Sequence, residues 1–289
     1  MVYQWNNLVL SSFLLWLDNQ ILTKGQAFTN VDSKLYPAGT TFNGYSQYNF
    51  PFSQLVSDTG VPGANVPTGL YLNSFFAGVG TSGLVGINYY KGQAYFSTGL
   101  ANSVQISGQY AVKDINIVLD SSPDISVLFE TKLNLRDKFG RNANNFTGIG
   151  NSEMSYPAIF CRQVGSNSEA FAMGGLKDTK NSIGCYIFCD SRFLLDAATS
   201  IIRDRKHNYI PLLEKNEFPF NNFGSFKNNI PYNYEGITAN KVANGSGLLV
   251  TDVIITDFSR KGLFSEVQAI TTDAYFSVAE FELSKPRLT

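Results

Sequence analysis

The sequence predicts a β-rich α+β protein, with a small antiparallel β-meander or barrel module inserted between an N-terminal helix and a larger β-sheet domain. Short apolar runs bounded by turn residues fill most of the chain, and two segments carry apolar residues at helical spacing. At 289 residues, the chain is long enough to bury a large core. We expect a helix and extended arm in 1–60, the β-module in 61–113, and the larger domain in 114–289 with one helix near 191–205.

Residues 7–24 predict the clearest helix. Apolar residues such as Phe13 and Trp16 occupy many sides of it, and Lys24-Gly25 is a typical C-terminal end. A helix that is apolar on so many sides is buried. Two interpretations follow: the helix packs on the sheet of its own domain, or it inserts into a neighbouring subunit.

Residues 27–69 are aromatic, polar and rich in turn residues. Prolines at 51, 62 and 67 interrupt any long element, so the pattern predicts an extended arm or a long connection. Residues 69–76 then predict the first strand of the β-module, because they form a short apolar run after a glycine.

The β-module is predicted from two apolar runs, 84–90 and 93–98, which are separated by Lys91-Gly92. Glycine supplies the positive φ that a tight hairpin turn requires. A third run, 104–112, has its larger residues at alternate positions and predicts the next strand of the meander. The preceding glycines of 78–83 imitate a dinucleotide fingerprint, but they lead into a hairpin, so we expect an ordinary turn.

In the larger domain, the second helix is predicted over 192–205, with Asp190 or Ser191 as its cap. Two segments, 137–155 and 218–234, are predicted as loops. Along the last strand, Glu280 and Glu282 are expected to point outward. The predicted strands are 114–119, 127–133, 156–162, 184–189, 247–258 and 275–283.

Composition restricts the possible functions. The net charge is −1 without a basic cluster, which excludes nucleic-acid binding through the phosphate backbone. The apolar run 8–17 is too short to cross a bilayer, and no basic residue precedes it as in a signal peptide. We therefore expect that the chain is made in a cytoplasm and does not insert into a membrane. Charged residues make up 16% and aromatic residues 14%, which suits burial against neighbouring chains or a plain β-sandwich.

No pattern predicts an enzyme, a metal site or a cofactor. His207 is the single histidine and lies among charges, so we expect a solvated surface residue. Cys161, Cys185 and Cys189 are expected to be buried thiols, because the last two are spaced along a strand and not around a turn. The acidic residues that could form an acid–base pair are scattered, and no context selects two of them: Asp18, Glu130, Asp190, Asp196, Glu217, Asp252 and Asp257.

Two aromatic segments, 42–52 and 218–234, are the best candidates for a functional surface. Aromatic residues dominate the cores of protein interfaces, which favours contact with other subunits. Internal packing is the first alternative, and a sugar platform of rings and amides is the second. With the N-terminal helix, the candidate interface residues are Trp16, Phe42, Tyr45, Tyr48, Phe50, Phe218, Phe220, Phe223, Tyr232 and Tyr234.

Four segments carry a resemblance: LYLNSFFAGVGTSGLVGINYYKGQAYFSTGL, SVQISGQYAVKDINI, CDSRFLLDAATSIIRD and FSVAEFEL. They resemble segments of tailed-bacteriophage virion structural proteins. The resemblance implies a non-enzymatic subunit of the neck, tail or baseplate, located in the virion and contacting its own copies and other virion proteins. The alternatives are a receptor- or carbohydrate-binding module at a tail tip, and an enzyme that degrades surface polysaccharide.

Overall fold

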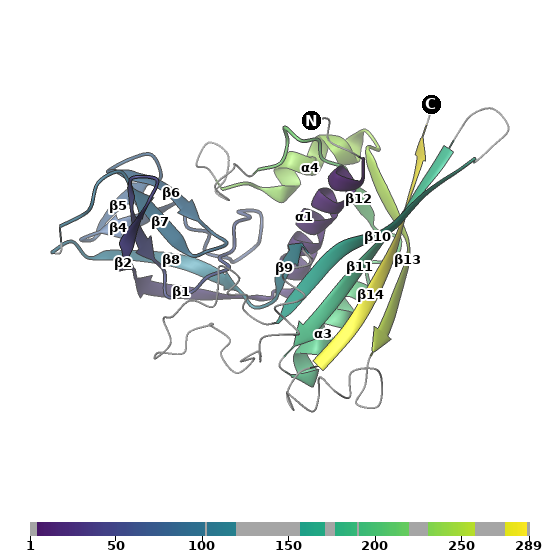
Figure 1. Cartoon of the computed structure of the whole chain (residues 1–289), viewed down its shortest axis with the longest axis horizontal. Coiled ribbons are helices and arrows are strands. Elements are labelled where there is room, and N and C mark those ends of the chain that lie inside the picture. Colours follow the sequence, from purple (N-terminus) through teal and green to yellow (C-terminus); the bar gives the residue numbers. More distant parts are fainter. Residues whose placement is uncertain are drawn as a thin grey trace. The chain divides into compact units, whose positions relative to one another are not determined.

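A computed structural model describes residues 5–101, 103–119, 157–170, 177–189, 191–219, 231–257 and 275–287. The predicted fold class is confirmed: the chain is β-rich, with antiparallel sheets and an N-terminal helix (Figure 1). The strand expected at 127–133 and the loop expected at 137–155 lie outside the described residues.

The chain divides into two compact units. The helix–sheet unit comprises residues 1–26, 115–216 and 238–289, and the small β unit comprises 27–114 and 217–237. The first segment of the small unit ends at residue 114, next to the expected end of the β-module at 113. The segment begins at residue 27 and not at 61, because residues 27–60 contribute strands to the small unit instead of forming an arm.

The helix–sheet unit is built on a six-stranded sheet of order β12-β13-β14-β11-β10-β9. All pairings are antiparallel except that of β9 with β10. The strands are β9 (Asn116–Leu119), β10 (Ala158–Ala170), β11 (Lys177–Cys189), β12 (Tyr209–Pro211), β13 (Gly247–Asp257) and β14 (Tyr275–Arg287). The helices are α1 (Trp5–Gly25), α3 (Arg192–Arg203) and α4 (Tyr234–Ala243), the last of which begins in the small unit's second segment.

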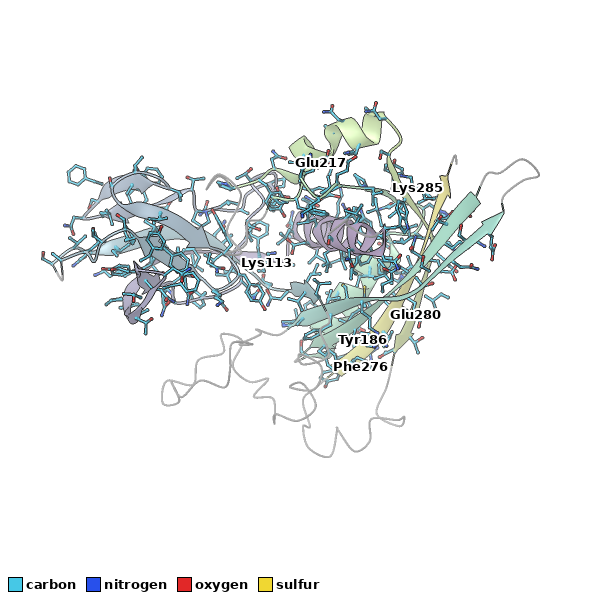
Figure 2. All side chains as sticks on the ribbon, turned by 45° about the horizontal axis from the view of Figure 1, so that its top comes forward. Lys113, Tyr186, Glu217, Phe276, Glu280 and Lys285 are labelled. Atoms are coloured by element: carbon cyan, nitrogen blue, oxygen red, sulfur yellow. The ribbon has the colours of Figure 1, made fainter. Side chains whose placement is uncertain are left out.

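Helices α1 and α3 cover one face of this sheet (Figure 1). The ring of Phe13 lies 4.9 Å from that of Phe281 on β14, and Trp16 contacts the same ring at 6.2 Å. Glu280 and Glu282 are exposed between buried neighbours, as predicted (Figure 2 labels Glu280). Of the two interpretations of the first helix, the structure shows packing on its own sheet.

The second predicted helix is confirmed as α3, and Ser191 caps it by accepting a hydrogen bond from the Leu194 amide at 3.3 Å. Helix α4 was not predicted. Its apolar side chains are few and Gly236 lies in its first turn, so helical periodicity is weak there.

The small β unit contains two four-stranded sheets, of order β1-β8-β4-β5 and β2-β3-β7-β6. Phe50 follows β3 of the second sheet and packs on Tyr110 of the first, with 4.9 Å between the ring centroids. The strands are β1 (Phe28–Lys34), β2 (Tyr36–Phe42), β3 (Tyr45–Asn49), β4 (Gly69–Leu72), β5 (Phe75–Gly78), β6 (Leu84–Asn88), β7 (Gln93–Phe96) and β8 (Ile106–Lys113).

The arm expected over 27–69 is wrong for its first half, which forms β1, β2 and β3. Asn43 and Gly44 have φ values of 49° and 82°, so they form the two-residue turn that closes a tight β-hairpin. Pro37 is tolerated because β2 is an edge strand.

The predicted hairpin of β6 and β7 is confirmed, and Gly92 has the expected positive φ of 61°. The predicted three-strand meander is wrong, because β8 pairs with β1 and β4 in the other sheet. Residues 97–105 separate β7 from β8, which allows the chain to cross between sheets. The glycines of 78–83 form a turn between β5 and β6, as expected.

Candidate protein interface

The most exposed aromatic side chain that the structure describes in the small β unit, Phe75, lies on the hairpin of β4 and β5. Asn73 and Ser74 connect the strands with φ values of 48° and 74°, which is the conformation of a tight two-residue hairpin turn. The Asn73 amide donates to the Gln105 carbonyl at 2.9 Å, and the Gln105 amide donates to Asn73 Oδ1 at 2.8 Å. These reciprocal bonds hold the hairpin tip to the segment before β8.

Phe75 and Phe76 follow this turn, and their exposed fractions are 80% and 56%. Consecutive side chains of a strand point to opposite faces, so one ring lies on each side of β5. Phe76 packs edge-on against Tyr71 at 5.4 Å and lies over Gly69, where a Cβ would come within 2.7 Å of its ring. Phe76 is therefore held in place, whereas Phe75 projects from the tip.

Among the strands that the structure describes, β5 is also an edge of its sheet, because it pairs with β4 on one side only. An edge strand presents backbone N–H and C=O groups that can pair with a strand of another chain. Soluble proteins usually protect such edges with lysine, proline or a bulge. Strand β5 reads FFAG and contains none of these charged or proline residues.

The surrounding sequence is almost without charge. Between Lys34 and Lys91, Asp58 is the one charged residue. It is fully buried, and its carboxylate accepts hydrogen bonds from the amides of Gly60 at 2.8 Å and Tyr234 at 3.0 Å. Strands β2 to β7 therefore carry no charged side chain, and no like-charge repulsion opposes contact with another apolar surface.

A second group of rings lies at the tip of the β2–β3 hairpin. Phe42 and Tyr45 flank the Asn43-Gly44 turn and are 39% and 37% exposed. The Phe42 ring lies 5.5 Å from that of Tyr95 on β7, and the Tyr95 hydroxyl is 3.0 Å from Gln93 Oε1. This hairpin presents rings beside an amide.

The ten predicted interface residues differ in their exposure to solvent. Phe42 and Tyr45 are exposed, Phe218 is half-buried, and Phe220 and Phe223 lie outside the described residues. The other five are buried in the fold of the chain itself: Trp16, Tyr48, Phe50, Tyr232 and Tyr234. In the single chain, these five side chains therefore pack internally, which was the first alternative to an interface.

Three of these buried side chains, Trp16, Tyr48 and Phe50, pack against aromatic rings of their own unit. Trp16 is 2% exposed and lies against Phe281. Tyr48 packs on Phe96 at 5.3 Å, and its hydroxyl accepts a hydrogen bond from the Leu100 amide at 3.0 Å. Burial also raises the pKa of Tyr234, with a further contribution from Asp58.

Sequence reasoning missed Phe75 and Phe76. It treated 69–76 as one strand, which would have placed both rings inside a sheet. Asn73-Ser74 was the available signal, because asparagine is one of the few non-glycine residues that readily adopt positive φ in a hairpin turn.

The other side chains with possible chemistry are separate. His207 is exposed, as predicted, and lies after α3. Cys161, Cys185 and Cys189 are buried, also as predicted. Among the described residues, no three His, Cys, Asp or Glu side chains are placed to hold a metal ion. No described helix has the length and apolar character needed to span a membrane.

The acidic residues considered for catalysis do not form one group in the parts of the chain that the structure describes. Asp196 and Asp257 both pair with Arg192, at 3.0 Å and 2.7 Å. Asp252 pairs with Lys206 at 2.7 Å. Asp18 is buried on α1, Glu217 is half-buried, and Glu130 and Asp190 lie outside the described residues.

No protein-family model matches the chain, and no curated protein matches its sequence.

Proposed function

We propose that the chain is a non-enzymatic structural subunit of a phage particle, in the neck, tail or baseplate, and that its small β unit joins it to other protein chains. The observation that supports this most is the β4–β5 hairpin. It combines a strand edge with two exposed phenylalanine rings, and strands β2 to β7 carry no charged side chain.

The proposed occupant of the edge is an uncharged strand of another particle subunit, which can be a second copy of this chain. Such a strand would add backbone hydrogen bonds to β5, and its apolar side chains would cover Phe75. The cost of desolvation on binding is small, because strands β2 to β7 have no charged side chain that would lose its water.

Complementation of the phage that encodes the chain tests this proposal. Phe75→Glu places a charge on the edge, and we expect its incorporation into purified particles to fall at least about tenfold, the equivalent of ~1.4 kcal/mol. Phe193→Glu is the matched control, because Phe193 is also 80% exposed but lies on α3. It should be incorporated like the wild-type chain.

Two results would contradict the proposal in different ways. Normal incorporation of Phe75→Glu would exclude the β5 edge as the contact. Absence of the wild-type chain from purified particles, measured by mass spectrometry, would exclude the structural role itself.

The β2–β3 hairpin favours a second candidate, a carbohydrate-binding module. Exposed rings stack on sugar carbons, and the Gln93 amide beside Tyr95 could bind hydroxyls. Binding of the purified chain to a glycan array, abolished in Tyr45→Ala, would favour this function. No binding to any glycan would remove it.

A further inference from the structure

Two of the three buried cysteines lie directly opposite one another on neighbouring strands. Cys161 on β10 and Cys185 on β11 are register partners, and their Sγ atoms are 3.5 Å apart. Both side chains are fully buried. At this separation, one thiol can donate its S–H to the sulfur of the other.

The strand register gives this pair the geometry that a disulfide needs. Opposed residues of antiparallel strands have Cα atoms roughly 4.5–5.5 Å apart, and disulfides accept Cα separations of about 4.4–6.8 Å. Bond formation requires the sulfurs to approach to about 2.05 Å, which small side-chain rotations can achieve.

Cys189 provides an internal comparison. It lies on the same strand and the same face as Cys185, but four residues further on, which is about 13 Å along a strand. Its register partner on β14 is Tyr275. Cys189 is therefore a buried thiol like Cys185, but the residue opposite it on β14 is not a cysteine.

We propose that Cys161 and Cys185 are an oxidation site, which a low-molecular-weight disulfide converts into a cross-strand disulfide between β10 and β11. One cysteine thiolate attacks a sulfur of the oxidant and displaces one thiol. The second cysteine then attacks the mixed disulfide and displaces the other thiol. The chain loses two protons and two electrons, and the oxidant is reduced to two thiols.

Access to the pair requires local opening of the sheet near its edge. Strand β9 has four residues, and Cys161 is the last residue of β10 with a partner on it. Beyond this point β10 is itself the edge among the described strands, so opening there disrupts few of the backbone pairs between them. Burial raises the pKa of Cys185, which favours the unreactive thiol and slows oxidation while the sheet is closed.

Peptide mapping of the folded, full-length chain tests the proposal. The chain is incubated with oxidised glutathione, remaining thiols are alkylated in denaturant, and the product is digested with trypsin and chymotrypsin. Cleavage after Tyr186 separates Cys185 from Cys189, which share one tryptic peptide. We expect one link, between Cys161 and Cys185, with a loss of about two mass units that a phosphine reductant reverses. Cys189 should stay a thiol during oxidation and should therefore be found alkylated.

Variants provide the controls. Cys189→Ala should form the same link to the same extent, whereas Cys161→Ala and Cys185→Ala should form none. The proposal is overturned if Cys161 and Cys185 are both found alkylated under conditions in which the oxidant fully oxidises a reporter dithiol. A link to Cys189 in the folded chain would also overturn it. None of these outcomes depends on the role of the chain in a particle.

Discussion

The ring of Phe13 on α1 meets the ring of Phe281 on β14 edge-on, with 4.9 Å between their centroids and 72° between their planes. Both side chains are fully buried. This contact joins helix α1 to strand β14, and it buries one apolar face of the helix on the sheet.

Phe13→Ala should therefore destabilise the helix–sheet unit. Removing a buried phenylalanine costs about 3–5 kcal/mol, through lost apolar burial and the cavity that remains. Denaturant unfolding followed by circular dichroism would measure the loss. Phe193→Ala is the control, because that ring is 80% exposed and its removal should change the free energy of unfolding by less than about 0.5 kcal/mol. Equal effects of the two variants would contradict the packing of α1.

The hairpin of β4 and β5 depends on a glycine. A Cβ at Gly69 would lie 2.3 Å from the Ala77 carbonyl oxygen, so Gly69→Ala should push the strands apart and cost about 1–3 kcal/mol. Gly78 lies directly opposite, and a Cβ there would meet its nearest atom at 3.7 Å. Gly78→Ala is thus the matched control and should be nearly neutral in thermal unfolding. If Gly78→Ala were the more damaging change, the register of this hairpin would be wrong.

The turn of the same hairpin has two separable requirements at Asn73. Asn73→Gly keeps the positive φ but removes the side-chain acceptor for the Gln105 amide, which should cost about 1 kcal/mol. Asn73→Ala loses the acceptor and also imposes strain of about 1–2 kcal/mol. Unfolding free energies should therefore fall in the order wild type, Gly variant, Ala variant. An Ala variant as stable as the Gly variant would show that the backbone there is not left-handed.

Asp252 should titrate below the usual range of an aspartate. The hydrogen bond from Lys206 at 2.7 Å is the main cause of its lowered pKa, and the Val253 amide contributes the second hydrogen bond. Because the folded pKa is lower than the unfolded one, this group stabilises the fold above the unfolded pKa of about 3.9. That contribution is lost as pH falls through the folded value.

NMR titration of the Asp252 carboxyl carbon would measure this pKa directly. In Lys206→Ala the pKa should rise toward the ordinary value, whereas Lys180→Ala should leave it unchanged, because Lys180 pairs with Glu169. A pKa that stays low without Lys206 would assign the shift to the backbone amide.

The elements that could be predicted from sequence are those whose signals are local. Helix α3 has its cap at Ser191 and its apolar residues within one short segment. The β6–β7 hairpin is encoded by two apolar runs and the turn at Gly92. The outward direction of Glu280 and Glu282 follows from the alternation along one strand.

The candidate interface could be predicted only in part. Phe42 and Tyr45 flank an Asn-Gly turn, and they are exposed. Phe50 belongs to the same aromatic segment, yet it is fully buried against Tyr110, which lies sixty residues later in the sequence. From composition, all three rings were predicted to lie at an interface, because composition contains no information about the opposing sheet.

Local sequence signals were enough to predict the β-rich class, helices α1 and α3 and the turn at Gly92, since each depends on residues within a few positions of one another. The choice of neighbouring strands depends on tertiary contacts: β8 joins β1 and β4, and the residues expected to form an arm become three strands. It thereby also decided which rings are exposed. Burial depends on what packs against a side chain from distant parts of the chain, and no local pattern specifies those partners.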